Sequence, residues 1–424
     1  MAMLLLEGGR LVCPLTGKDD HVDIRVKDGF VVEIGSGLSL NDGVRIDCSG
    51  AVVAPGLVDL GAELGDPGMT WREDLSTGSE AGAAGGFTTI IASPATDPVM
   101  DAPSLVNDLM VRGCALGGAR VLPAGALTVG LNGEQLAEIG LLAEAGCPAI
   151  SDGGIVVGDS SVLRRALDYV RPFGIPLLLR PGEPVLHGNG VMHEGLVSIR
   201  VGLRGVPTAS EEIGLTRIVS LVRHTGCPVH ITHVTSADGL RLVVSAKNEG
   251  LPITVSCPAR NLLLCDEAVE DTEYDTRVRL EPPLRAAGDR AALRSAVVAG
   301  DIDALISDHR PWSRVEKEVE FEWAQPGAIG LETALGAALE GLEGDVSSAI
   351  RALAVAPASV VGRRASVEVG GVADLVVFEP LGRQVVGQSR RSRGTNEPLE
   401  GWDLPGRIRA TLVEGRVVYG PQLP

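Results

Sequence analysis

Several residues that could do chemistry lie just after short apolar runs of this chain. His230 and His233 come with one such run, Asp308 and His309 follow another, and Glu63 follows a third. Imidazole and carboxylate groups gathered in one place can hold a divalent metal or move protons during hydrolysis. These residue types therefore indicate a hydrolytic or metal-binding site, provided that the fold brings the ends of the runs together.

Arginines occupy further positions of the same kind, namely Arg180, Arg260 and Arg310. Guanidinium groups that converge bind carboxylates or phosphates, so a small anion is one possible ligand. Buried charges usually pair, however, and these arginines could equally neutralise neighbouring acids. The acids in question are Glu63, Asp66, Glu281 and Asp308.

The middle of the chain alternates apolar strand-like runs with segments of helical spacing. The runs begin near residues 52, 88, 119, 148, 176, 228, 252 and 304. Residues 160–170 and 211–226 are examples of the helical segments between them. Eight such repeats predict an α/β fold of the (β/α)₈ barrel type, with a site at the carboxyl ends of the strands. A doubly wound open sheet is the alternative.

Both ends of the chain have a different, β-rich texture. Short alternating strands occur at 22–26 and 30–34, and similar stretches return at 373–380 and 407–420. We expect a small β-sandwich assembled from the two ends, with residues 1–54 and 363–424 flanking a barrel at 55–362. The polar stretch 384–402 is predicted to be a loop.

Composition narrows the class of protein. The formal charge of −18 argues against nucleic acid or an anionic membrane as a partner. The seven cysteines are dispersed, and no stretch has an export signal or the roughly 18 apolar residues of a membrane span. We expect a cytoplasmic protein with free thiols.

The motifs along the chain resemble those of the dihydroorotases, which are cyclic amidohydrolases. The matching segments are PGLVDLGAELGDPGMTWREDLSTGSEAGAAGGFTTI (55–90), SDGG (151–154), MHEGLVS (192–198), HITHVTS (230–236), EPPLR (281–285), SDHRPW (307–312), GLET (330–333) and ADLVVFEP (373–380). The resemblance implies metal-assisted hydrolysis of a cyclic amide in pyrimidine biosynthesis, usually with zinc. Zinc lowers the pKa of a bound water and polarises the amide carbonyl.

The metal ligands that the resemblance implies are mostly replaced in this chain. Gly61 and Glu63 stand where the family has a His-x-His pair. Gly153 stands at the bridging carboxylate, and Arg180, 27 residues later, stands at a histidine. Glycine offers no donor atom, and a guanidinium repels a cation.

The substrate-binding positions also depart from the family pattern. Gly65 stands where the resemblance implies an arginine that grips the substrate carboxylate, and Ala95 replaces an asparagine that also holds substrate. Glu281 replaces an asparagine before Pro-Pro-Leu-Arg, and Trp312 replaces the second histidine of the last motif.

Only His233 and Asp308 match the catalytic set, where the resemblance implies a metal ligand and a general base. We expect them to be vestigial and no cofactor to be bound; a weak metal would need Glu63 as third ligand. His230 and His309 are expected to have core or hydrogen-bonding roles.

These departures lead to the expectation of an inactive, dihydroorotase-like protein. It would act as a structural partner of the aspartate transcarbamoylase catalytic subunit, and we expect this chain to form a homo-oligomer. The first alternative is a hydrolase of dihydroorotate with an altered or mononuclear zinc site. The second is a small-anion binding or sensing module. The residues expected around its pocket are Glu63, Arg180, Arg260, Glu281 and Arg310.

Overall fold

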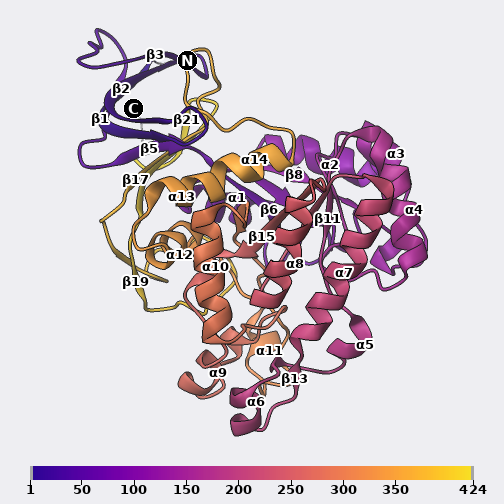
Figure 1. Ribbon diagram of the computed structural model, residues 1–424. Coiled ribbons are helices and arrows are strands. Elements are labelled where there is room, and N and C mark those ends of the chain that lie inside the picture. Colours follow the sequence, from indigo (N-terminus) through magenta and orange to yellow (C-terminus); the bar gives the residue numbers. More distant parts are fainter. Residues whose placement is uncertain (1–2, 422–424) are drawn as a thin grey trace.

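The apolar runs form two separate sheet systems in the computed structural model, which describes residues 3–421 (Figure 1). The first is an eight-stranded sheet with the order β21-β20-β17-β5-β1-β2-β3, in which β4 pairs with β1. Its strands are β1 (Leu4–Cys13), β2 (Lys18–Lys27), β3 (Phe30–Gly35), β4 (Val44–Asp47), β5 (Val52–Pro55), β17 (Leu375–Glu379), β20 (Arg407–Val413) and β21 (Arg416–Tyr419). The two ends of the chain thus build one sheet, which has its own apolar cluster.

The second system is the predicted barrel. Its strands are β6 (Leu57–Ala62), β7 (Phe87–Ala92), β8 (Arg120–Pro123), β9 (Gly125–Ala126), β10 (Ile150–Ser151), β11 (Leu177–Leu179), β14 (Val229–Ile231), β15 (Ile253–Pro258) and β16 (Ala304–Ile306). The strands pair in parallel from β6 to β8 and from β9 to β16, and β8 and β9, separated only by Ala124, together occupy the third strand position. The ring closes where Glu63 N–H donates to the His309 carbonyl at 2.8 Å and Ser307 N–H donates to Asp59 Oδ1 at 2.7 Å.

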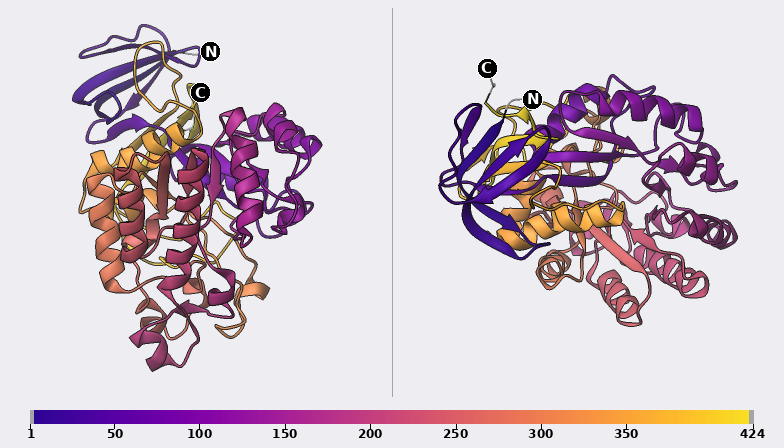
Figure 2. Two further views of the ribbon diagram at one scale, coloured as in Figure 1. Left: turned by 45° about the vertical axis from the view of Figure 1, so that its right-hand side comes forward. Right: turned by 90° about the horizontal axis from the view of Figure 1, so that it is seen from above.

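The outer layer consists of helices that follow the strands. The longer ones are α1 (Leu75–Ala84), α2 (Pro103–Cys114), α3 (Ile139–Glu144), α4 (Ser160–Val170), α7 (Thr208–Thr225), α8 (Ala237–Asn248), α10 (Ala287–Ala299) and α12 (Ala334–Gly341). Figure 2 shows them arranged around the strands when the molecule is seen from above. Residues 160–170 and 211–226 fall on α4 and α7, as their apolar spacing predicts.

Short elements sit in the loops. They are α5 (Pro184–His187), α6 (Leu196–Val201), α9 (Ala268–Asp271), α11 (Arg314–Lys317), α13 (Val346–Ile350), α14 (Ala356–Val360), β12 (Met192–His193), β13 (Gly205–Val206), β18 (Gln384–Val385), β19 (Asp403–Leu404), 3₁₀ turns at Val129–Leu131, Arg171–Phe173, Ala259–Leu262 and Thr276–Val278, and a π turn at Arg351–Val355. α5, α6, α9 and α11 gather at the end of the barrel away from the eight-stranded sheet (Figure 1). These loops follow the carboxyl ends of the strands.

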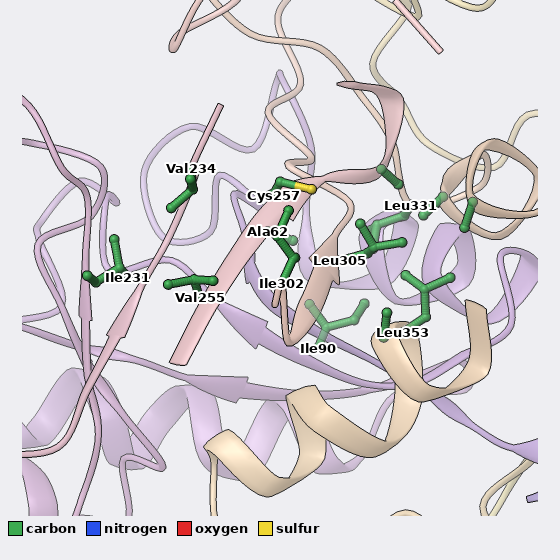
Figure 3. Close-up of a cluster of buried hydrophobic side chains, with 14 of the residues drawn as sticks. Ala62, Ile90, Ile231, Val234, Val255, Cys257, Ile302, Leu305, Leu331 and Leu353 are labelled. Atoms are coloured by element: carbon green, nitrogen blue, oxygen red, sulfur yellow. The ribbon is translucent and has the colours of Figure 1, made fainter. Parts of the chain in front are cut away.

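Aliphatic side chains fill the space between strands and helices. Val255 and Cys257 of β15 and Leu305 of β16 pack with residues such as Leu331 and Leu353 (Figure 3). Each such side chain is almost fully buried, and burial contributes roughly 1.5–3 kcal/mol per side chain. A rigid barrel therefore holds the loop residues in place.

The run that begins near residue 52 does not form one strand. Val52–Pro55 (β5) pairs with β17 and β1 of the eight-stranded sheet, whereas Leu57–Ala62 (β6) opens the barrel. Gly56 allows the switch because a Cβ there would lie 2.2 Å from Thr88 Cγ2. The domain limits at 54/55 and 362/363 stay predictions, and residues 1–2 and 422–424 of the outer segments lie outside the described residues.

All seven cysteines of the chain are free. Within residues 3–421 no helix combines the length and hydropathy needed to cross a bilayer. The predicted loop 384–402 is largely irregular but contains β18, and its Asn396 and Glu397 are buried.

Candidate functional site

Several of the residues singled out in the sequence line one pocket at the carboxyl ends of the barrel strands. Four of them are Glu63 after β6, His233 after β14, and Asp308 and Arg310 after β16. The pocket has a volume of about 30 Å³, enough for about two water molecules at roughly 10–15 Å³ each. It is too small for a six-membered ring.

His233 and Asp308 form a buried pair in this pocket. His233 Nε2 lies 2.9 Å from Asp308 Oδ1, and His233 Nδ1 is buried without a hydrogen-bond partner. Burial by itself would raise the pKa of the Asp308 carboxyl, but the interaction with His233 and the charge of Arg260 outweigh it and hold that pKa well below its usual range. Asp308 is therefore an anion that fixes the orientation of the imidazole.

Arg260 supports Asp308 from behind and lies outside the pocket. Its Nη1 donates to Asp308 Oδ2 at 2.7 Å. Its Nη2 donates to the carbonyls of Ser307, Asp308 and Ile329 at 2.6, 2.9 and 3.2 Å. Arg260 is 3% exposed, so its guanidinium is committed to holding the backbone after β16.

Glu63 and Arg310 form a second ion pair, with Arg310 Nε 2.7 Å from Glu63 Oε1. Although burial lowers the pKa of Arg310, the negative charges of Glu63 and Asp308 raise it overall. The Arg310 carbonyl accepts a hydrogen bond from Asn396 Nδ2 at 2.9 Å, so the segment 384–402 helps to position this arginine.

Arg180 and Glu281 form a third pair, which extends to His187 on α5. Arg180 Nη2 donates to Glu281 Oε1, and His187 Nε2 lies 2.6 Å from Glu281 Oε2. Burial opposes ionisation of Glu281, yet the charge of Arg180 and the hydrogen bond from His187 lower its pKa. The Arg180 backbone N–H donates to Asp152, whose pKa burial raises to about 7.

The three arginines thus do not converge on one anion, as the second alternative required. Each is bound to a carboxylate of its own: Arg180 to Glu281, Arg260 to Asp308 and Arg310 to Glu63.

The other two predicted histidines are part of the core. His230 is buried, with its ring nitrogens 2.9 Å from Thr254 Oγ1 and 3.0 Å from Ser256 Oγ. Burial lowers the pKa of His230 to about 3, so this ring is neutral. His309 Nε2 lies 3.4 Å from Glu73 Oε2, and its Nδ1 accepts from Gly330 N–H at 3.2 Å.

The sequence reasoning missed His187, Asn396 and Arg279. His187 had no signal beyond its place in the loop after β11, and Asn396 lay in a stretch predicted to be a simple loop. Arg279 lies two residues before Glu281, which directly precedes the Pro-Pro-Leu-Arg motif. This closeness to the motif could have pointed to Arg279.

A zinc ion of the family type does not fit the donor set of this site. In the part of the chain that the structure describes, no three His, Cys, Asp or Glu side chains are grouped to hold a metal ion. Glu63 faces Arg310, and His233 faces Asp308, so the predicted trio of Glu63, His233 and Asp308 does not form a ligand set. Zinc sites use at least three protein ligands.

Comparison with known proteins identifies relatives over the full length of the chain. Residues 50–239 match the family model described as dihydro-orotase-like, and residues 186–418 match the amidohydrolase family. The chain is 39% identical to the dihydroorotase of Citrifermentans bemidjiense, with 98% of this chain and 99% of the relative covered. It is 40% identical to the dihydroorotase of Pelobacter propionicus with the same coverage.

Solved structures show the same fold. The L-hydantoinase (dihydropyrimidinase) of Arthrobacter aurescens matches 100% of this chain and 98% of its own, with a TM-score of 0.88 and 24% identity. The dihydropyrimidinase of Brevibacillus agri matches 99% of this chain and 95% of its own, with a TM-score of 0.83 and 20% identity.

These relatives overturn the expectation of an inactive structural partner. The matched relatives carry the name of an enzyme, dihydroorotase, and align with this chain from end to end. The leaning toward a non-enzyme was wrong for the same reason. The expectation of no cofactor is overturned as well, because the full-length match places the chain in a family whose usual metal is zinc. The family relationship thus implies zinc, while the donor residues of this site fit a zinc ion poorly.

The barrel, the order of the motifs and the identity over 98% of the chain agree with one another. On this evidence, the chain belongs to the dihydroorotase family of the amidohydrolase superfamily.

Proposed function

We propose that this chain hydrolyses a cyclic amide, converting dihydroorotate to carbamoyl aspartate in pyrimidine biosynthesis, with an altered active site. The observation that carries the proposal is the end-to-end match to proteins named dihydroorotase at 39–40% identity. The fold does not by itself require an active site. Its well-filled core does hold the remaining polar groups in fixed positions.

The backbone at the site supports a catalytic role for the His233–Asp308 pair. His233 has a φ of 55° and Asp308 a φ of 46°, in the left-handed region that residues with a Cβ rarely adopt. Such conformations cost free energy and are concentrated at functional sites. Two such residues, at the ends of β14 and β16, are joined by a hydrogen bond, and this supports a catalytic role for the pair.

The residues of this chain can supply the proton transfers of amide hydrolysis. When His233 Nε2–H donates to Asp308, Nδ1 carries the lone pair; because this atom is buried and unpaired, it accepts a proton once a water enters beside it. That water oxygen forms a bond with the ring carbonyl carbon, the C–N bond breaks, and the proton passes from His233 to the departing nitrogen. The Asp308 anion stabilises the imidazolium between the two transfers.

The proposal is tested by measuring dihydroorotate hydrolysis, and cyclisation of carbamoyl aspartate in reverse, on protein as purified and after zinc addition. Replacing a general base lowers turnover by about 10²–10⁴-fold, so His233→Ala should show a loss of that order. His224→Ala, at an exposed position on α7, is the control and should retain activity. Absence of turnover under both conditions, or equal turnover in His233→Ala, contradicts the proposal.

Association with the catalytic subunit of aspartate transcarbamoylase, assembly into a homo-oligomer and a cytoplasmic location all stay predictions. Their support is the family resemblance and the composition. Co-purification with that subunit and light scattering on the purified chain measure the first two.

A further inference from the structure

A larger cavity adjoins the small pocket at the carboxyl ends of the strands. It has a volume of about 480 Å³ and shares Gly154 with the small pocket. Its walls combine the aliphatic residues Ile155, Val156 and Val206 with a series of prolines. Cavities of a few hundred Å³ with apolar walls and a few charged groups are the usual form of small-molecule sites.

The three glutamates that line this cavity all have cationic partners. Glu183 pairs with Arg217, and Glu281 pairs with Arg180 and His187. Glu211 lies 3.7 Å from Arg285 and also accepts hydrogen bonds from the backbone and hydroxyl groups of Thr235 and Ser236. The acidic groups in the wall are thus neutralised.

Arg279 is the exception among the arginines of the wall. It is 8% exposed, and within residues 3–421 no carboxylate lies within ion-pair distance of it. Its Nε is buried without a partner, and its Nη1 donates a long hydrogen bond of 3.4 Å to the Leu280 carbonyl. Burial lowers the pKa of Arg279, because desolvating a cation is costly, and the charge of Glu281 opposes this only in part.

Lys317 adds a second positive charge behind Arg279. Its Nζ donates to the Gln325 carbonyl at 2.8 Å and to the Arg279 carbonyl at 3.4 Å. Lys317 is also buried, and no ion pair with a carboxylate forms at its Nζ in the described chain. Desolvation and the charge of Arg279 lower the pKa of Lys317 to about 7, so Lys317 gives up its proton more readily than an exposed lysine and Arg279 keeps its charge.

We propose that the cavity binds a small monoanionic carboxylate, with Arg279 as the residue that receives the carboxylate group. One guanidinium without a counterion matches one negative charge, and its planar fork suits a carboxylate. The apolar wall then holds the body of the molecule. Dihydroorotate, a ring with a single carboxylate, has this chemistry, so the inference rests on the proposed function and deepens it.

A side chain at position 65 cannot take over this role. Gly65 has a φ of 63°, and a Cβ there would lie 2.7 Å from the carbonyl oxygens of Glu73 and Met69. Position 65 is where the family resemblance implies the carboxylate-gripping arginine. Arg279 offers a buried, uncompensated guanidinium in its place, at the wall of a cavity large enough for a ring.

The test is calorimetric titration with dihydroorotate and, separately, with dihydrouracil, which has the same ring without the carboxylate. His233→Ala is used as the parent so that turnover adds no heat. Adding Arg279→Gln should weaken dihydroorotate binding at least tenfold and leave dihydrouracil binding unchanged, and Arg279→Lys should recover part of the loss. Arg294→Gln, which removes an arginine bonded to the Leu262 carbonyl outside the cavity, is the matched control.

Equal dihydroorotate affinity in Arg279→Gln and its parent overturns the inference, and so does the absence of any dihydroorotate binding to the parent. Thermal melting of Arg279→Gln verifies that it is folded; since an unpaired buried cation is removed, its melting temperature should not fall. Binding that depends on Arg279 without any hydrolysis in the wild-type chain would sink the proposed function and leave this inference standing. Hydrolysis by the wild-type chain, with dihydroorotate binding that does not depend on Arg279, would support the proposed function and overturn this inference.

Discussion

His233 Nε2 lies 2.9 Å from Asp308 Oδ1, and the pair joins the carboxyl end of β14 to that of β16. Arg260 bonds the other oxygen of Asp308 at 2.7 Å. The aspartate is therefore held between an imidazole and a guanidinium, and any change at this position affects both partners.

Asp308→Asn should lower dihydroorotate turnover by about 10²–10⁴-fold, because a neutral amide neither stabilises an imidazolium nor fixes one tautomer. It should also lower the free energy of unfolding by about 3–5 kcal/mol, since Arg260 is left buried without a counterion. Turnover assays and urea denaturation measure the two effects.

Asp238→Asn is the matched control for this substitution, because Asp238 on α8 pairs with Arg241 at the surface. Exposed pairs contribute about 0–1 kcal/mol. The pKa of Asp308 is depressed in the folded state, so its contribution is present above its unfolded pKa and is lost as the pH falls through the folded value. Equal stability of Asp308→Asn and Asp238→Asn at neutral pH contradicts the prediction.

His187 should titrate above the usual value of about 6.5 for histidine. Its hydrogen bond to Glu281 raises its pKa more than burial lowers it. The added stability is thus fully present below the unfolded pKa and is lost as the pH rises through the folded one. NMR titration of the His187 imidazole in wild-type protein and in Glu281→Gln should show the pKa falling in the variant. A wild-type pKa at or below 6.5 would refute this.

Gly153→Ala should destabilise the fold by about 1–3 kcal/mol, the usual cost of overpacking. Gly153 has a φ of 63°, and a Cβ there would lie 2.7 Å from Leu131 Cδ1. Gly61→Ala is the matched control, because a Cβ at Gly61 meets no atom within 4 Å. Chemical denaturation of the two variants measures the difference, and an equal loss in both would show that crowding by Leu131 is not the cause.

Adding a histidine side chain to the pocket as a metal ligand should raise the affinity of the protein for zinc. Gly61→His places an imidazole in the pocket that Glu63 and His233 line, and Arg310→Gln releases Glu63 from its ion pair. With three donors available, the double variant should bind zinc at least about tenfold more tightly than Arg310→Gln alone. Calorimetric zinc titration measures this. Equal affinity would mean that His233 stays engaged with Asp308.

The sequence predicted the barrel. It also predicted that the polar residues meet at the carboxyl ends of the barrel strands. Buried runs without alternation, each followed by a helical segment, are typical of a parallel barrel, and in such a barrel all carboxyl ends lie at one face. Glu63, His233, Asp308 and Arg310 therefore line one pocket. The prediction was weaker at the run near residue 52, because apolarity alone cannot tell which of two sheets a strand joins.

The expectation of an inactive protein was wrong because it rested on single missing metal ligands. Gly61, Gly153 and Arg180 do depart from the family pattern, yet the departures say nothing of what the remaining groups do together. The end-to-end relatives carry an enzyme's name, and that evidence comes from whole-chain similarity rather than from single positions.

The sequence by itself determined the fold, the family and the identity of the residues at the strand ends. Tertiary structure alone decided the partners: Arg260 binds Asp308, Arg180 binds Glu281, and Arg279 forms no ion pair within the described chain. The physical reason is that apolar periodicity is local and readable along the chain. The free energy of a buried charge depends instead on atoms that lie tens to hundreds of residues away in sequence, and these come together only in the folded barrel.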